Sequence, residues 1–179
     1  EEKMNKFENL LALSPLVYII HHAEEHIIFN FREWREKYFL DNNFLSTEEM
    51  LMRIIGVFLI VFFVHLVTKN RPSALIAIFF LMGSQVVNVI FHTFFSFYYN
   101  DFSPGVITAV LLYLPLNYFI LKAALSEGFL KNNFEVILIF SLGCITFALF
   151  EIFGPLILAI STMLCAFYYV SSMYIMKTR

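Results

Sequence analysis

Long apolar runs alternate with short polar segments along the whole chain, and each run has roughly the length of a membrane crossing. A transmembrane helix needs about 20 mostly apolar residues, so the pattern predicts six spans. The predicted spans cover residues 9–31, 51–68, 73–99, 104–125, 134–150 and 155–176. Residues 32–39 mix charged and aromatic side chains, which is typical of a short helix at the membrane interface. We therefore expect one all-α domain, residues 1–179: a polytopic transmembrane helical bundle of about six spans plus a short interfacial helix.

Local signals mark some of the helix ends. The Ser-Thr-Glu-Glu sequence at residues 46–49 has the pattern of a helix start, with a capping hydroxyl and acidic residues in the first turn. Pro15 falls in the first turns of the first predicted span, where proline is tolerated or kinks the helix. Pro115 lies inside the fourth span and predicts a kink there.

Composition supports a membrane protein and excludes some functions. The chain is 60% hydrophobic and only 15% charged, whereas a soluble domain is about 45–50% apolar and about 25% charged. The basic residues are scattered, without an aromatic-interleaved basic patch, so nothing indicates a nucleic-acid partner. We expect membrane lipids to surround the protein.

Basic residues are concentrated on one side of the predicted bundle. Six spans place both termini on that side, with the connections between spans two and three and between spans four and five. These segments contain Lys3, Lys6, Lys69, Arg71, Lys122, Lys131, Lys177 and Arg179. Because Lys and Arg are enriched in cytoplasmic segments, we expect both termini to be cytoplasmic. The expected location is a bacterial plasma membrane.

One apolar run contains a polar stretch, His-His-Ala-Glu-Glu-His at residues 21–26. Ionisable residues inside a span are costly and usually functional. Helix positions three and four apart share a face, so His21 meets Glu24 and Glu25, while His22 meets Glu25 and His26. A second polar stripe lies on the third span. It consists of Gln85, Asn88 and His92. The predicted topology places both groups in the outer half of the bundle.

These residue types favour a metal site. Imidazole and carboxylate together suit zinc first, and non-haem iron or manganese second. The candidate metal ligands are His21, His22, Glu25, His26 and His92. Glu24 and Glu25 are candidate catalytic carboxylates. Asn88, Gln85 and Thr108 are candidates to orient a bound ligand. The sequence from His22 to His26 also matches the H-x-x-E-H pattern of inverted zinc peptidases.

The ordered motifs resemble those of a known family. His21-x-x-Glu24-Glu25 is followed by Asn88-x-x-x-His92 and then by an aromatic-Ser-Pro-Gly turn at residues 102–105. This combination resembles the HXXEE-domain membrane proteins, from the first helix through the fourth. The resemblance implies no particular activity. It implies that His21, Glu24, Glu25, Asn88 and His92 form the core set, without requiring His22 or His26. Family members often carry Tyr where this chain has Phe102.

The leading hypothesis is an intramembrane metalloenzyme that acts on a lipid-like or hydrophobic membrane substrate. Hydrolysis is the simplest reaction, and iron-dependent oxidation could use the same ligands. A proton-coupled small transporter could use the same cluster as a proton relay. A non-catalytic lipid-binding or partner membrane protein is the third hypothesis.

Overall fold

Helices make up nearly all of the chain that the computed structural model describes, residues 6–39 and 45–178. No strand occurs in these residues, which confirms the all-α prediction. The helical elements in chain order are α1 (Lys6–Leu11), α2 (Ser14–Ala23), η1 (Glu24–Ile28), α3 (Phe31–Tyr38), α4 (Thr47–Thr68), α5 (Arg71–Leu81), η2 (Met82–Val86), α6 (Val87–Tyr98), α7 (Val106–Thr108), η3 (Ala109–Tyr113), α8 (Leu114–Ser126), α9 (Asn133–Phe153) and α10 (Leu156–Lys177). The segments η1, η2 and η3 are π-helical.

Five helices in the described part of the chain are long and apolar enough to cross a membrane, which indicates an integral membrane protein. They are Thr47–Thr68, Arg71–Tyr98, Val106–Ser126, Asn133–Phe153 and Leu156–Lys177. These five match the predicted second to sixth spans, with ends that differ by a few residues. The second of them joins α5, η2 and α6, and the third joins α7, η3 and α8.

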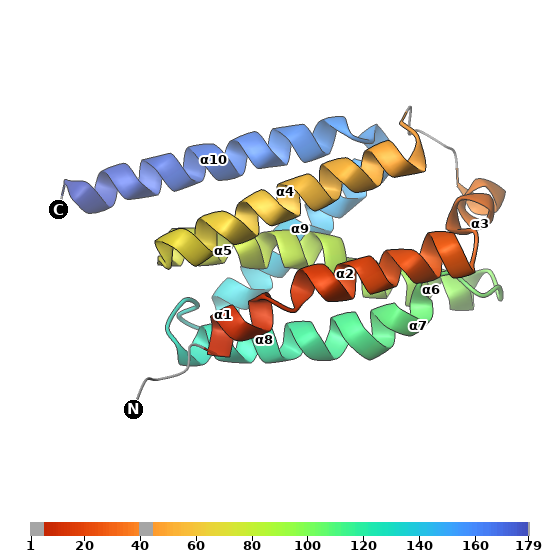
Figure 1. The fold of residues 1–179 in the computed structure, drawn as a ribbon, viewed down its shortest axis with the longest axis horizontal. Coiled ribbons are helices and arrows are strands. Elements are labelled where there is room, and N and C mark those ends of the chain that lie inside the picture. Colours follow the sequence, from red (N-terminus) through yellow and green to blue (C-terminus); the bar gives the residue numbers. More distant parts are fainter. Residues whose placement is uncertain (1–5, 40–44, 179) are drawn as a thin grey trace.

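The first predicted span, residues 9–31, is not one continuous helix. Ala12 and Leu13 form a turn between α1 and α2, and η1 ends at Ile28. Pro15 explains the interruption, because it has no backbone N–H to donate to the carbonyl of Leu11. The described residues therefore contain five candidate spans and an interrupted helix where six spans were predicted. Even so, α1 begins and α10 ends at the same end of the bundle (Figure 1).

Three further predictions concern the start of the second span, the short helix after the first span, and Pro115. Ser46 caps α4 and forms a capping box with Glu49, as the sequence predicts. A short helix, α3, is present where the interfacial helix was predicted. Pro115 lies at the start of α8, directly after the π-helical segment η3. The irregularity predicted at this proline therefore coincides with a π-helical turn.

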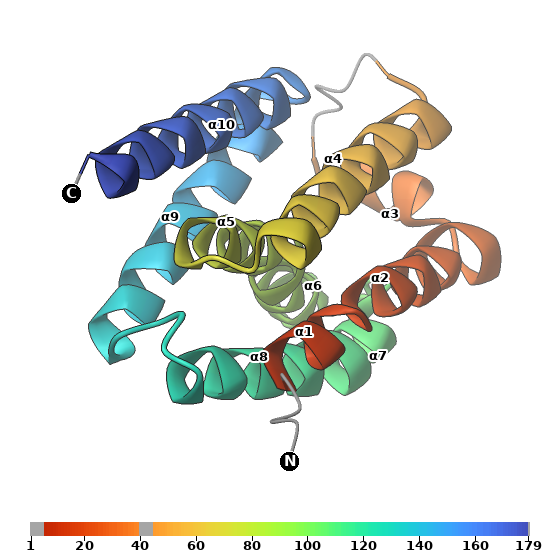
Figure 2. The same ribbon diagram turned by 60° about the vertical axis from the view of Figure 1, so that its left-hand side comes forward.

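The helix formed by α5, η2 and α6 lies at the centre, and the other long helices surround it (Figure 2). Half of its apolar window is buried, whereas α10 contributes no buried residue. Helix α9 approaches η2 closely at two glycines. A side chain on Gly143 would come within 3.0 Å of the backbone nitrogen of Gly83. Small residues allow such close backbone contact between membrane helices.

Candidate metal centre

The predicted motif lies at the junction of α2 and η1, at the end of the bundle opposite the two terminal helix ends (Figure 1). His21 belongs to the last turn of α2, and Glu24 is the first residue of η1. A π-helical turn contains one more residue than an α-helical turn, and such turns occur frequently at functional sites. Here it coincides with a segment in which three histidines surround one carboxylate.

Glu25 lies at the centre of this arrangement and is buried. Its Oε1 atom lies 3.4 Å from Nε2 of His21 and 3.1 Å from Nε2 of His92 on α6. The side chains of both histidines are 0% exposed, and that of Glu25 is 4% exposed. These three residues form a group that could hold a metal ion.

The other oxygen of Glu25 faces two further histidines. Oε2 is hydrogen-bonded to Nδ1 of His22 over 2.6 Å and lies 3.7 Å from Nε2 of His26. The side chains of His22 and His26 are 15% and 21% exposed. His22, Glu25 and His26 form a second group that could hold a metal ion.

The two fully buried histidines are oriented by hydroxyl groups. Nδ1 of His21 is hydrogen-bonded to Oγ1 of Thr108 over 2.9 Å, and Nδ1 of His92 to Oγ of Ser103 over 2.8 Å. A neutral imidazole that donates from Nδ1 presents a lone pair at Nε2, the form that binds metal ions. Within the described residues, Nε2 of His92 is buried and makes no hydrogen bond. Both rings therefore direct Nε2 toward Glu25.

Glu24 is buried beside Glu25 but faces a different set of groups. Its Oε1 accepts hydrogen bonds from the backbone N–H groups of Gly105 and Ile107, each over 3.2 Å. Its Oε2 accepts a 2.7 Å hydrogen bond from the backbone N–H of Thr108. These N–H groups belong to the start of the helix Val106–Ser126, where unpaired donors and the helix dipole favour an anion. Glu24 thus fixes η1 to this helix and lies outside both candidate metal groups.

Gly105 allows the backbone to lie directly against the cluster. It has a positive φ of 96°. A Cβ atom at this position would lie 2.8 Å from Cε1 of His21, 2.9 Å from Cγ of Glu25 and 3.0 Å from Cε1 of His92. A side chain there would displace the three residues of the buried group. The aromatic-Ser-Pro-Gly turn therefore forms one wall of the site, with Ser103 and Gly105 as its contact residues.

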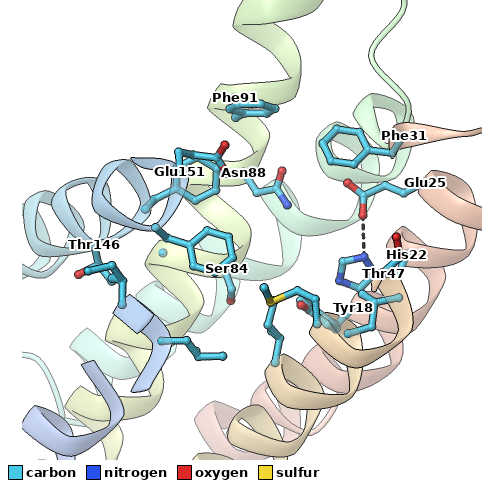
Figure 3. Close-up of a pocket in the computed structure, with 18 of the residues that line it drawn as sticks. Tyr18, His22, Glu25, Phe31, Thr47, Ser84, Asn88, Phe91, Thr146 and Glu151 are labelled. Carbon is cyan, nitrogen blue, oxygen red and sulfur yellow. Dashed lines mark hydrogen bonds and ion pairs between the residues drawn. The ribbon is translucent and has the colours of Figure 1, made fainter. Parts of the chain in front are cut away.

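A cavity of about 240 Å³ reaches the cluster from the middle of the bundle. Its polar wall contains His22, Glu25, His26 and Asn88, while most of its remaining lining is apolar and comes from α4, α6, α9 and α10. Asn88 and Glu25 point toward the same space (Figure 3). Nδ2 of Asn88 also lies 3.4 Å from Nε2 of His21.

Arg35 and Glu151 close part of the cavity wall between α3 and α9. Their side chains are joined by a 2.7 Å ion pair and are 20% and 24% exposed. Both residues line the cavity. This ion pair links α3 to the bundle beside the candidate site.

The structure separates the predicted site residues into those at the cluster and those beside it. His21, His22, Glu25, His26 and His92 come together, with Asn88 and Thr108 in contact with His21. Gln85 does not reach the cluster. It accepts a 2.8 Å hydrogen bond from Asn117 and donates to the carbonyl of Ser14, which joins three helices.

Sequence reasoning assigned no contact with the cluster to Ser103, Gly105 or Tyr113. The ring of Tyr113 is fully buried with its centroid 4.5 Å from that of His21. The Ser-Pro-Gly turn was a visible signal for the first two residues. Tyr113 offered no signal, because the π-helical segment η3 that contains it cannot be read from hydrophobic periodicity.

Comparison with known proteins identifies the chain at the family level. The family described as "Protein of unknown function with HXXEE motif" matches residues 12–120, which is well over half of the chain. No curated protein and no solved structure matches. The matched region contains the candidate metal centre, including His21, Glu25 and His92. The chain therefore belongs to the family of proteins of unknown function with the HXXEE motif.

Proposed function

We propose that the protein is an intramembrane metalloenzyme whose ion is held by His21, Glu25 and His92. The observation that supports this proposal is the convergence of two imidazole Nε2 atoms on one carboxylate oxygen in a fully buried position. Two histidines and one carboxylate, with a further position left for water or substrate, are the ligand set of several catalytic zinc sites. The same set also binds non-haem iron.

The spacing of these atoms suits zinc. Bonds of about 2.0–2.1 Å in tetrahedral geometry separate neighbouring ligand atoms by about 3.4 Å. The observed separations from Oε1 of Glu25 are 3.4 Å to His21 and 3.1 Å to His92. We therefore propose zinc first, with iron or manganese as the second choice.

A lipid-like substrate fits the cavity beside this centre. Glu25 and Asn88 lie at one wall and the Arg35–Glu151 ion pair at another, while most of the remaining lining is apolar. Cavities for small ligands usually combine an apolar lining with a few placed polar groups. The polar end of an amphiphile would lie at Glu25, with its hydrocarbon part between α4, α9 and α10.

Hydrolysis is the reaction that this arrangement supports best. In ester hydrolysis, the oxygen of water bonds to the carbonyl carbon, the ester bond breaks, and the proton of water passes to the leaving alcohol. A bound zinc ion supplies Lewis-acid activation of such a water. With a single ion bound, Glu25 and His22 are hydrogen-bonded at the cavity wall, where they can accept and pass on a proton. Glu24 is unsuited to this task because both of its oxygens accept backbone N–H groups.

The proposed topology places the centre in the outer half of the membrane. The end of the bundle where α1 begins and α10 ends would face the cytoplasm, in a bacterial plasma membrane. The cluster lies at the other end (Figure 1). The substrate would then come from the outer leaflet.

Metal analysis together with a lipid assay tests the proposal. We expect full-length protein in nanodiscs to retain zinc, and we expect His92→Ala to lose it. His65→Ala is the matched control, because His65 is a fully buried histidine that bonds Ser73 instead of the cluster. Glu25→Gln should retain the fold and release no product from membrane lipids. A wild-type protein that binds no zinc, iron or manganese would contradict the proposal, and flux assays would then test a proton-coupled transporter.

A further inference from the structure

We propose that Glu25 bridges two divalent ions, the second of which is held by His22 and His26 at the cavity wall. This inference rests on the proposed metal centre at His21, Glu25 and His92. It adds an ion that the single-ion proposal does not require. It also assigns a role to two histidines that lie outside the H-x-x-E-E pattern.

The two oxygens of Glu25 have separate sets of partners. Oε1 faces His21 and His92, whereas Oε2 faces His22 and His26. In each set the ligand atoms lie within 4.8 Å of one another. A carboxylate that binds one ion through each oxygen holds the pair close together, as in two-metal hydrolases with ions about 3.5–4 Å apart.

Burial distinguishes the two ion positions. The side chains of His21 and His92 are fully buried and do not line the cavity. Those of His22 and His26 are partly exposed, and both line the cavity together with Glu25. An ion on the Oε2 side would therefore be the one that meets an incoming substrate. An ion on the Oε1 side would lie deeper, on the side of Glu25 where the buried His21 and His92 are.

His22 already makes the contact that such an ion would replace. Its Nδ1 is hydrogen-bonded to Oε2 of Glu25, and this is the contact that the second ion would replace. The rings of His22 and His26 are stacked with centroids 5.9 Å apart. This stacking keeps both imidazoles on the same side of Glu25.

Charge predicts unequal affinities for the two ions. Glu25 supplies one negative charge, while the charge of Glu24 is taken up by backbone N–H groups. The second divalent ion therefore meets the residual positive charge of the first in a medium of low dielectric constant. We expect two binding steps, with the step at His22 and His26 at least tenfold weaker.

Titration with Mn²⁺, followed by electron paramagnetic resonance, tests the inference on full-length protein in nanodiscs. The wild type should bind two ions per chain. When the second ion binds, exchange coupling between the two Mn²⁺ ions should weaken the hyperfine lines that an isolated Mn²⁺ shows. His26→Ala should bind one ion and keep the lines of an isolated ion. His65→Ala should behave as the wild type. The partly exposed side chain of His26 makes its replacement compatible with folding.

The possible failures can be told apart. A wild type that binds one ion, lost in His92→Ala and kept in His26→Ala, overturns the second site and leaves the single-ion proposal standing. One ion that is lost in His26→Ala and kept in His92→Ala overturns both assignments. No bound ion in the wild type also overturns both. Two ions without magnetic coupling overturn the bridging role of Glu25.

Discussion

The backbone N–H of Thr108 donates a 2.7 Å hydrogen bond to Oε2 of Glu24, a residue 84 positions earlier in the chain. The side-chain hydroxyl of the same threonine is hydrogen-bonded to His21. One residue at the start of the fourth predicted span thus contacts two residues of the H-x-x-E-E pattern. The two adjacent glutamates consequently have different surroundings, since one faces backbone donors and the other faces imidazoles.

This difference predicts that replacing Glu by Gln mainly lowers stability at position 24 and mainly lowers zinc affinity at position 25. Glu24→Gln removes a charged acceptor of backbone hydrogen bonds and should destabilise the protein by about 1.5–3 kcal/mol, while the folded protein still binds zinc. Glu25→Gln should lower zinc affinity at least tenfold with a smaller effect on stability. Thermal unfolding in detergent and zinc per chain measure the two effects. Loss of zinc from a Glu24→Gln variant of normal stability would contradict the assignment.

Gly105→Ala should disrupt the cluster without changing any of its polar residues. The new methyl group would lie within 3.0 Å of atoms of His21, Glu25 and His92. We expect zinc affinity to fall at least tenfold. Gly128→Ala is the matched control, because Gly128 also has a positive φ but a Cβ there meets nothing within 4 Å. Equal zinc affinity in the two variants would show that the close approach at Gly105 does not matter.

The hydroxyls that orient the histidines should tune metal affinity. Loss of such an outer partner typically lowers metal affinity about 10–100-fold, so Ser103→Ala and Thr108→Val should each have an effect in this range. Thr93→Val is the control, since the Thr93 hydroxyl donates to a carbonyl of its own helix, that of Val89. Competition with a zinc chelator gives the affinities. An effect of Thr93→Val as large as that of Thr108→Val would argue for a general loss of packing.

Acid should weaken the contact between helix α3 and Asp101. Asp101 accepts hydrogen bonds from Tyr38 over 2.7 Å and from Lys37 over 3.0 Å. These bonds, that of Tyr38 first, lower the pKa of Asp101. A carboxyl group whose pKa is lowered by folding stabilises the protein above its unfolded pKa of about 3.9, and this contribution is lost as the pH falls through the folded value.

Hydrogen exchange in α3 measures this contact. Exchange should show constant protection between about pH 5 and 8 and reduced protection below about pH 3.9. Asp101→Asn should show the reduced protection at every pH, because its side chain carries no charge to lose. A wild type whose protection in α3 does not depend on pH would rule out this contact as the pH-sensitive one.

The sequence was sufficient for most of the fold, because apolar runs of membrane length are a strong signal. It also predicted a hydroxyl cap at Ser46 or Thr47, since capping depends on residues within one turn, and the structure has the cap at Ser46. It did not reveal the break at Ala12 and Leu13, because proline near a helix start is compatible with both a continuous and an interrupted helix. The break is therefore a property of the folded chain that hydropathy alone cannot resolve.

The sequence predicted which residues form the site, but not which partners each of them contacts. Helical spacing placed His21 beside Glu24 and Glu25, and the predicted topology placed His92 at the same depth; in the structure His21, Glu25 and His92 lie together. The spacing could not distinguish Glu24 from Glu25, because the donors that bind Glu24 belong to Gly105 and to α7 and are distant in sequence. By α-helical spacing Gln85 shares a stripe with His92, but Gln85 lies within the π-helical segment η2 and bonds Asn117.

The partners of Glu24 and Glu25 have a consequence for how the protein enters the membrane. During synthesis, the motif leaves the ribosome 81 residues before Gly105, the first of the backbone donors to Glu24. Charged groups in a bilayer without partners are costly. We therefore expect the short, interrupted first helix to stay at the translocation channel or at the lipid headgroups until the fourth predicted span has been made. Its final burial becomes a late step of biogenesis, completed only when the turn that binds Glu24 has been made.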